Sequence, residues 1–279
     1  MGSASTPVKA FRLRDFVIGA GRLTVIAGPC MLESLELCLD VGRSMRDLCS
    51  QLDCDYIFKG SFDKANRTSL SSPRGPGLDG GLEILRRVTS ELGVPVLTDI
   101  HEPWQAAPAA AVVDMLQIPA FLARQTDLLV AAARTGRPVN VKKAQFMAPW
   151  DMRPVVEKLS EAGCTGVLLT ERGSTFGYNT LVVDFRGLPT MRALGYPVCF
   201  DVTHSLQQPS GLGSQSGATR EFAPHLARAA AAVGIDALFL EVHTNPAAAL
   251  SDAAAQLTPD EACGVLREVC AIRGALQPG

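Results

Sequence analysis

The chain repeats one pattern from end to end: a short apolar run followed by a segment with apolar residues at helical spacing. The apolar runs are short, bounded by turn residues, and typical of strands buried on both faces. Strands that alternate with helices in this way predict a parallel sheet. The predicted strands cover residues 23–27, 56–58, 94–101, 114–118, 138–143, 166–170, 197–202 and 237–241, and the predicted helices cover 33–51, 78–92, 104–112, 123–134, 152–161, 189–194, 219–233 and 259–272.

Eight strand–helix units in a chain of 279 residues predict an α/β fold, a (β/α)8 TIM barrel. No linker interrupts the pattern, so we expect residues 1–279 to form a single domain. An open doubly wound sheet is the alternative, but no glycine-rich dinucleotide fingerprint follows the first strand. Residues 8–20 alternate weakly, which predicts a short hairpin ahead of the barrel, and the small polar residues 1–6 predict a disordered start.

The composition excludes several classes of protein. A net charge of −2, with 19% charged residues, provides no basic field for nucleic acid. No apolar run is long enough to span a bilayer, and the start lacks the apolar core of a signal peptide. The eight cysteines include no CxxC pair. With no secretion signal, we expect a cytoplasmic protein whose thiols are reduced. We expect seven of them to be small core residues and treat Cys30 as a site candidate.

Chemically reactive side chains follow the predicted strands at their C-terminal ends. In a barrel these ends meet on one face, where active sites are built. Turn formation alone favours glycine, serine, asparagine and aspartate at such positions. A thiol, amines, carboxylates, imidazoles and a guanidinium are not explained in that way. The strand-end candidates are Cys30, Lys59, Asp99, His101, Gln117, Lys142, Arg172, His204 and Glu241.

One group of these residues is cationic. The segment 58–69 contains two lysines, an arginine, an amide and several hydroxyl groups, directly after an apolar strand. A solvated surface loop has this composition too, but further cations at other strand ends favour a site for a multiply charged anion. Lysine and arginine together suit phosphate and carboxylate groups. The cationic candidates are Lys59, Lys64, Arg67, Lys142 and Arg172.

A second group resembles a metal-ligand set: Cys30, His204, Glu241 and Asp252. Thiolate, imidazole and carboxylates suit a borderline divalent ion such as Zn²⁺, Fe²⁺ or Mn²⁺. Each residue also has an ordinary interpretation, as a core thiol, a hydrogen-bonded histidine, a buried ion-pair partner and a helix cap. Two other histidines, at positions 101 and 243, are rival ligands. A glycine-rich stretch at 210–217 is typical of a lid or of a plain flexible loop.

From Ile26 to the last predicted helix, the chain resembles the 3-deoxy-D-manno-octulosonate 8-phosphate synthase family. The matching stretches include Ala-Gly-Pro-Cys, Phe-Lys-Gly-Ser-Phe-Asp-Lys-Ala-Asn-Arg, Asn-Val-Lys-Lys-Ala-Gln-Phe and Phe-Asp-Val-Thr-His-Ser. These four stretches occupy residues 27–30, 58–67, 140–146 and 200–205, and shorter matches occur at 98–102, 117–127, 171–173, 176–179, 241–243 and 251–253. The resemblance implies a (β/α)8 barrel whose bottom is closed by an N-terminal hairpin.

The resemblance also implies the reaction. In this family, phosphoenolpyruvate condenses with arabinose 5-phosphate and water to give the eight-carbon keto acid phosphate and inorganic phosphate, for the inner core of lipopolysaccharide. Lys64, Lys142 and Arg172 are implied to hold phosphoenolpyruvate, whereas Lys59 and Asn66 contact the sugar. The full set of implied substrate-binding residues is Lys59, Ser61, Lys64, Asn66, Arg67, Gln117, Ala120, Lys142 and Arg172.

Members of the family divide into metal-dependent and metal-independent enzymes. The dependent members resemble this chain, with cysteine at position 30 and Ser-Asp-Ala around position 252. The resemblance therefore implies one divalent ion held by Cys30, His204, Glu241 and Asp252. It also implies a homotetramer in which Arg67 binds the sugar phosphate of a neighbouring subunit. Asp99, His101 or a metal-bound water could move the protons, and the residues expected to act in catalysis are Lys64, Asp99, His101, Lys142 and His204.

Two other functions stay open at this point. The heptulosonate 7-phosphate synthases of aromatic biosynthesis share the Gly-Pro-Cys start and the metal set, but read Lys-Pro-Arg where this chain has residues 64–67. The extra polar residue suits a sugar with one more hydroxyl group, arabinose 5-phosphate instead of erythrose 4-phosphate. A barrel that only senses sugar phosphates is the third possibility, and such a protein is expected to have lost at least one cation or ligand.

Overall fold

A closed barrel of eight parallel strands forms the centre of the computed structural model, which describes residues 7–208 and 217–276. Each strand pairs in parallel with both neighbours, in the order β11-β14-β3-β4-β5-β6-β7-β8, which returns to β11. This confirms the predicted (β/α)8 fold. The strands are β3 (Thr24–Gly28), β4 (Asp55–Lys59), β5 (Val96–Asp99), β6 (Met115–Ile118), β7 (Val139–Lys142), β8 (Val167–Glu171), β11 (Val198–Asp201) and β14 (Ala237–Glu241).

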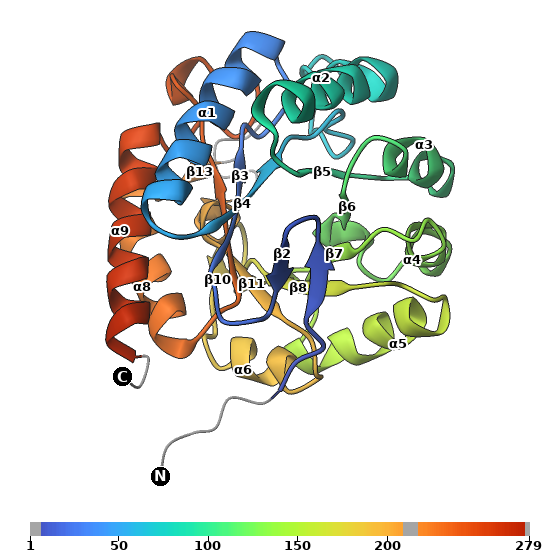
Figure 1. Ribbon diagram of the computed structural model, residues 1–279, viewed down its shortest axis with the longest axis vertical. Helices are drawn as coiled ribbons and strands as arrows, with labels where there is room; N and C mark the ends of the chain where they lie inside the picture. The colour runs from blue at the N-terminus through green and yellow to red at the C-terminus, as the bar shows by residue number, and fades with distance from the viewer. Residues whose placement is uncertain (1–6, 209–216, 277–279) are drawn as a thin grey trace.

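The helices form an outer ring around the strands (Figure 1). Apolar side chains at helical spacing face inward, as in α1, where Cys38, Val41 and Met45 are fully buried. The side chain of Ser34 caps this helix by accepting a hydrogen bond from the backbone N–H of Leu37. The ring consists of α1 (Leu35–Gln51), α2 (Gly77–Leu92), α3 (Ala106–Ala110), α4 (Thr126–Ala133), α5 (Arg153–Glu161), α6 (Gly187–Arg192), α8 (Ala223–Val233) and α9 (Pro259–Leu276).

Some predicted boundaries are wrong by a few residues. The helix predicted at 104–112 is a 3-10 turn, η1 (Pro103–Gln105), followed by the short α3. The helix predicted at 219–233 starts as another 3-10 turn, η4 (Arg220–Phe222), and α8 begins only beside Pro224, whose ring lacks an N–H and favours the first helical turn. Short elements in the loops were not predicted: α7 (Val202–Ser205), β9 (Ser174–Thr175) with β10 (Leu181–Val182), and β12 (Gln207–Gln208) with β13 (Gly217–Ala218).

The predicted N-terminal hairpin is present and fills the barrel from one end. Strands β1 (Phe11–Leu13) and β2 (Phe16–Ile18) pair antiparallel, and Figure 1 shows them in dark blue across the middle of the ring. Phe11, Leu13 and Ile18 pack in one apolar cluster with inward-facing strand residues, among them Ile26, Ile57, Leu97, Leu168 and Phe239. Because Thr24 and Asp55 start the strands at this end, the hairpin closes the bottom and leaves the C-terminal ends open for chemistry.

Replacing Phe11 with alanine is expected to lower the free energy of unfolding by about 3–5 kcal/mol, the usual cost of emptying a buried phenylalanine site. Phe11 is only 6% exposed, and its ring lies against Gly166, where a Cβ atom would come within 2.3 Å of it. Urea denaturation measures the effect. Phe146→Ala is the matched control, because that ring is 62% exposed and its loss should cost less than about 0.5 kcal/mol. Equal costs for the two variants would contradict a sealing role for the hairpin.

None of the helices within the described ranges has the length and apolar character needed to cross a membrane. The predicted disordered start at 1–6 lies outside the described residues, and so does most of the predicted lid, residues 210–216.

Candidate active site

Charged residues end most strands of the barrel. The last residues of β4, β5 and β7 are Lys59, Asp99 and Lys142, and those of β8, β11 and β14 are also charged. Their side chains meet on one face because all the strands run in the same direction. They surround a cavity of about 590 Å³. Site candidates that line it are Lys59, Ser61, Lys64, Asn66, Arg67, Asp99, His101, Gln117, Ala120, Lys142, Arg172, His204 and Asp252.

Cys30 and Glu241 lie behind this lining and have no exposed surface. The Cys30 Sγ atom lies 3.2 Å from Oδ2 of Asp252, and one ligand atom each from Cys30, Glu241 and Asp252 falls within 4.8 Å of the others. His204 stands beside this group, with Nε2 at 3.5 Å from Oε1 of Glu241. The fold therefore brings together four residues that are far apart in the sequence.

Three properties of this cluster fit a divalent cation. Glu241 Oε2 is buried without a hydrogen-bond partner among the described residues, so it has an unused lone pair. Burial and the neighbouring Glu241 carboxylate raise the pKa of Cys30, and a bound cation would reverse this by stabilising the thiolate. Asp252 adopts a left-handed φ of 47°, a conformation that is uncommon outside glycine and that gathers at functional sites.

The cations lie next to the cluster. Lys59 Nζ donates to Ser61 Oγ at 2.9 Å and to Glu241 Oε1 at 3.4 Å, although only 2% of Lys59 is exposed. Burial lowers the pKa of Lys64, but the charges of Cys30, Glu241 and Asp252 outweigh it and raise the pKa well above its usual value. Lys64 therefore stays protonated and available to an anion.

The guanidinium group of Arg172 includes a hydrogen-bond donor that lacks an acceptor in the described structure. Arg172 is 4% exposed, and its Nη2 atom donates to Gln207 Oε1 at 2.8 Å. Its Nη1 atom is buried and has no hydrogen-bond partner in the described structure. A buried guanidinium nitrogen without an acceptor costs free energy unless a ligand supplies one. Because Arg172 lines the cavity, the missing acceptor is expected to be an anionic ligand.

Asp99 and His101 form a separate polar group on the cavity wall. Ser61 Oγ donates to Asp99 Oδ1 at 2.5 Å, and the other oxygen of Asp99 lies 3.0 Å from His101 Nε2. Burial works to raise the pKa of Asp99, but the hydrogen bond to His101 and the charge of Lys59 hold it well below its usual range. Asp99 is thus a carboxylate that orients the imidazole, and His101 Nδ1 is buried without a partner among the described residues.

Several other candidates have partners of their own. Arg67 is anchored at the rim of its own cavity, where it donates to the carbonyls of Pro73 at 2.8 Å and Leu250 at 2.6 Å. Gln117 is 4% exposed and accepts from Asn140 Nδ2 at 3.0 Å. The rival ligand His243 is not part of the ligand cluster: its Nδ1 accepts from the backbone of Asn245, and its Nε2 lies 3.7 Å from Glu33.

Sequence reasoning missed two carboxylates, Asp201 and Glu171. Asp201 has no exposed surface, and its Oδ2 atom accepts from Lys142 Nζ and lies 2.8 Å from His204 Nδ1. The charges of His204 and Lys142 overcome the effect of burial and lower the pKa of Asp201. Like Lys59, both Asp201 and Glu171 are charged residues at the C-terminal ends of their strands, which is the criterion used to choose site candidates. They were missed because sequence reasoning selects Arg172 and His204, which follow them closely in the sequence, as the candidates at these two strand ends.

Glu171 supports the chain around Arg172. Its Oε1 atom accepts from the backbone N–H groups of Arg172 at 2.9 Å and Gly173 at 2.6 Å, and it lies 3.6 Å from Lys143 Nζ. Lys143 is completely buried, and burial lowers its pKa. This lysine also donates to the carbonyls of Ala144 and Met147 and to Ser174. The pair fixes the backbone that presents Arg172 to the cavity.

Replacing Lys143 with methionine is expected to lower the free energy of unfolding by about 3–5 kcal/mol, because Glu171 would keep a buried charge without its counter-ion. Chemical denaturation measures the effect. Lys158→Met, on the surface of α5, is the control and should change stability by less than about 0.5 kcal/mol. If Lys143→Met were as stable as the control, the buried pair would not hold this loop.

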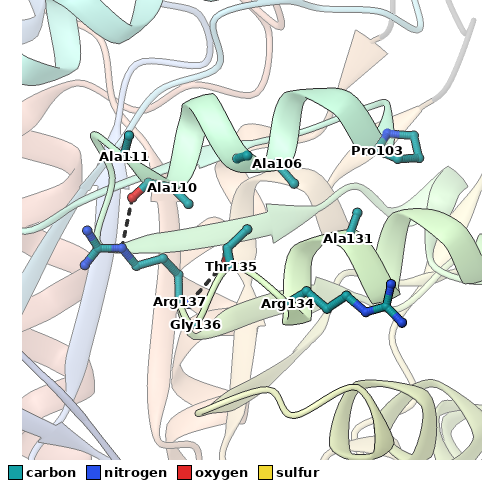
Figure 2. Close-up of a pocket in the computed structure, with 10 residues that line it drawn as sticks. Pro103, Ala106, Ala110, Ala111, Ala131, Arg134, Thr135, Gly136 and Arg137 are labelled. Atoms are coloured by element: carbon teal, nitrogen blue, oxygen red, sulfur yellow. Dashed lines mark hydrogen bonds between the residues drawn. The ribbon is translucent and has the colours of Figure 1, made fainter.

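A second cavity, of about 620 Å³, opens between α3 and α4, away from the strand ends (Figure 2). Alanines such as Ala106, Ala110 and Ala131 form much of its lining. Arg137 closes one end by donating from Nε to the carbonyl of Ala110 at 3.0 Å. The lining includes no carboxylate, histidine or thiol, so this cavity lacks the groups that make the strand-end cavity a candidate active site.

Comparison with known proteins agrees with the site. Residues 5–271 match the sequence model of the DAHP synthetase I family. A protein of Cyanothece sp. named 2-dehydro-3-deoxyphosphooctonate aldolase is 60% identical over 263 residues, which are 94% of this chain and 96% of that protein. Proteins of the same name from Synechococcus sp. and Desulfatibacillum aliphaticivorans are 58% and 54% identical over 98% and 92% of this chain, and over 96% and 95% of their own lengths. The chain therefore belongs to the DAHP synthetase I family, in the group whose members are named 2-dehydro-3-deoxyphosphooctonate aldolase.

Proposed function

We propose that this protein is a transferase that condenses phosphoenolpyruvate with D-arabinose 5-phosphate and water to form 3-deoxy-D-manno-octulosonate 8-phosphate and phosphate. The product is a precursor of the lipopolysaccharide inner core. The observation that carries the proposal is the convergence of Lys64, Lys142 and Arg172 on one cavity, in a chain at least half identical to proteins named for this product. Two phosphorylated substrates require this density of positive charge.

The cations divide between the two substrates. Arg172, with its unpartnered Nη1, and Lys64 bind the phosphate and carboxylate of phosphoenolpyruvate, together with Lys142. Lys59 and Asn66 contact the sugar. Arg67, at the rim, binds the sugar phosphate held in the active site of a neighbouring subunit. Ser61, Gln117 and Ala120 complete the wall of the cavity and limit the poses that the substrates can adopt.

The reaction joins carbon 3 of phosphoenolpyruvate to the aldehyde carbon of the sugar. The electron pair of the enol double bond forms the new carbon–carbon bond, and the aldehyde oxygen gains a proton. Water then adds to carbon 2 and loses one proton. The resulting hydroxyl group loses its second proton to form the keto group, while the carbon–oxygen bond to phosphate breaks and its electron pair leaves with the phosphate. His101, oriented by Asp99 at 3.0 Å, is placed to move one of these protons. His204, whose Nδ1 atom is held by Asp201, acts in catalysis through the ligand cluster, which its Nε2 atom faces.

We propose one divalent metal ion, zinc, iron or manganese, bound by Cys30, His204, Glu241 and Asp252. The donor set and the unused Glu241 oxygen support this assignment. When bound, such an ion polarises a carbonyl oxygen or activates a water molecule. Lys59 then balances the excess negative charge of the ligands, since it already touches Glu241 and the carbonyl of Cys30.

The expected assembly and location are also proposals. We propose a homotetramer in which Arg67, at the cavity rim, contributes to a neighbouring active site. The exposed ring of Phe121, a residue that lines the cavity and is 55% exposed, supports an interface near this rim. We propose a cytoplasmic enzyme formed from a single barrel domain, in agreement with its eight free cysteines.

Phosphate release tests the reaction. With phosphoenolpyruvate and arabinose 5-phosphate, we expect phosphate to appear at least about 100-fold faster, in kcat/KM, than with erythrose 4-phosphate. The extra hydroxyl group of the five-carbon sugar has polar partners in this cavity, which the shorter sugar would leave unpaired. Preference for erythrose 4-phosphate would assign the heptulosonate reaction instead. Binding of both substrates by calorimetry, with no phosphate released, would indicate a sensor without catalytic activity.

A further inference from the structure

Two cysteine thiols meet at a point that the proposed reaction does not use. The Sγ atoms of Cys54 and Cys270 lie 3.5 Å apart, although the residues are 216 positions apart in the sequence. Cys54 directly precedes β4, and Cys270 lies on α9. Among the cysteines of the described chain, no other two sulfur atoms come within hydrogen-bonding distance of each other.

The pair lies at the end of the barrel opposite the active site. Cys54 comes before the first residue of β4, whereas Lys59, the last residue of that strand, lines the active-site cavity. A strand of five residues separates these ends by roughly 16 Å. α9 packs against α1, the helix that leads into Cys54, so a bond between the two thiols would join the C-terminal helix to the start of β4 (Figure 1).

The two thiols differ in exposure and acidity in the way that a reactive pair requires. Cys54 is 6% exposed, whereas Cys270 is partly open to solvent. The hydrogen bond from Cys54 lowers the pKa of Cys270 in spite of its burial, and the guanidinium of Arg273, one turn further along α9, lowers it further. A partly exposed thiol with a lowered pKa beside a second thiol is typical of cysteines that oxidise reversibly.

We propose that Cys54 and Cys270 form a peroxide-reactive dithiol that closes to a disulfide and fastens α9 to the barrel. The Cys270 thiolate attacks hydrogen peroxide, which forms an S–O bond, breaks the O–O bond and releases hydroxide. The Cys54 thiol then attacks the oxidised sulfur of Cys270, which forms the S–S bond and expels the oxygen as water with the thiol proton. The two sulfurs are oxidised by two electrons, one peroxide is reduced to two waters, and a dithiol reductant reverses the change.

Mapping of the oxidised protein tests the proposal. After treatment of the folded enzyme with hydrogen peroxide, we expect the loss of two of its eight free thiols. Trypsin should then release a cross-linked pair of peptides, 47–59 and 268–273, that separates on reduction. The oxidised protein should melt about 5 °C higher than the reduced protein, because the bond closes a long loop of the unfolded chain. An unchanged melting temperature would contradict the fastening of α9.

Variants identify the partners. C270A and C54A should each abolish the cross-link, and C270A provides an independent test because its position is partly exposed and tolerant of alanine. C263A is the matched control on the same helix, since Cys263 is partly exposed but has no thiol partner in the described structure, and it should keep the cross-link. Cys49 lies in the same tryptic peptide as Cys54, so the mass of the cross-linked peptides does not distinguish the two cysteines. If Cys54 is the partner, C49A should keep the cross-link. A cross-link that persists in C54A, or eight intact thiols after peroxide treatment, would overturn the proposal.

Discussion

Replacing Asp201 with asparagine is expected to reduce kcat for phosphate release on the order of 100-fold. The Oδ2 atom of Asp201 accepts a hydrogen bond from Lys142 Nζ and also lies 2.8 Å from His204 Nδ1. Asparagine keeps the volume but removes the negative charge that pairs with a buried lysine and orients the histidine. Lys142 would then lose its counter-ion while its ammonium lies 3.6 Å from the centre of the Phe239 ring. Steady-state kinetics with phosphoenolpyruvate and arabinose 5-phosphate measures the loss.

A matched control separates this effect from loss of stability. Asp236 is also buried at 6% exposure, and it bonds Arg192 and the backbone of Val198 at the opposite end of the barrel. Asp236→Asn should therefore lower the melting temperature while the folded enzyme keeps its kcat. Asp201→Asn should lower kcat at temperatures where it is fully folded. If both variants kept full activity per folded molecule, Asp201 would have only a structural role.

The sequence predicts most of this site because strand ends in a parallel barrel share one face. That rule selects Lys59, Asp99 and Lys142 from local patterns alone, and each does line the cavity. It fails for Asp201 and Glu171 because each lies shortly before another polar residue, His204 or Arg172, which the local pattern selects in its place. Strand boundaries depend on hydrogen bonds to neighbouring strands, which lie far away in the sequence, so local composition cannot place them closely.

The metal-ligand candidates show a different limit. Cys30 and Asp252 are separated by 222 positions, and no local spacing signals that their side chains meet at 3.2 Å. The residue types by themselves are compatible with a metal site and with ordinary structural roles, and the resemblance to a family is what favours the metal. The sequence allowed for burial of Cys30 and Glu241 only as an alternative to a ligand role. The structure places both behind the cavity wall, since β3 and β14 are neighbours whose registers place Glu241 beside Gly28. Burial of this kind is a property of the closed barrel and of no single strand.

The sequence also gives no indication that the thiols of Cys54 and Cys270 meet. Cys54 and Cys270 have the apolar neighbours of ordinary core residues, and this supports the expectation of small hydrophobic side chains. Their contact depends on how α9 returns to the first strands of the barrel, which a linear pattern does not contain. The same return of the chain brings Asp252, in the loop before α9, to Cys30. One closure of the barrel thus creates both the proposed metal site and the proposed dithiol, at opposite ends.

Removal of the metal is expected to lower kcat at least about 100-fold, since a bound cation supplies several kcal/mol of charge stabilisation in such sites. Without it, the carboxylates of Glu241 and Asp252 lie close together, and burial raises the pKa of Cys30, which then stays a neutral thiol. Treatment with a chelator, followed by desalting and a phosphate-release assay, measures the loss. Adding zinc, iron or manganese back in turn should restore activity and identify the ions that the site accepts.

Metal content distinguishes a ligand role from a general effect of chelation. Elemental analysis of purified protein should find one divalent ion per chain, and Cys30→Ala should lose it while remaining folded. Cys38→Ala is the matched control, because Cys38 is equally buried but lies within α1, outside the ligand cluster, and this variant should keep its metal. Full activity in protein that contains no measurable metal would refute the assignment. In that case Cys30 and Asp252 would serve the cavity only through their contact with each other and with Ser251.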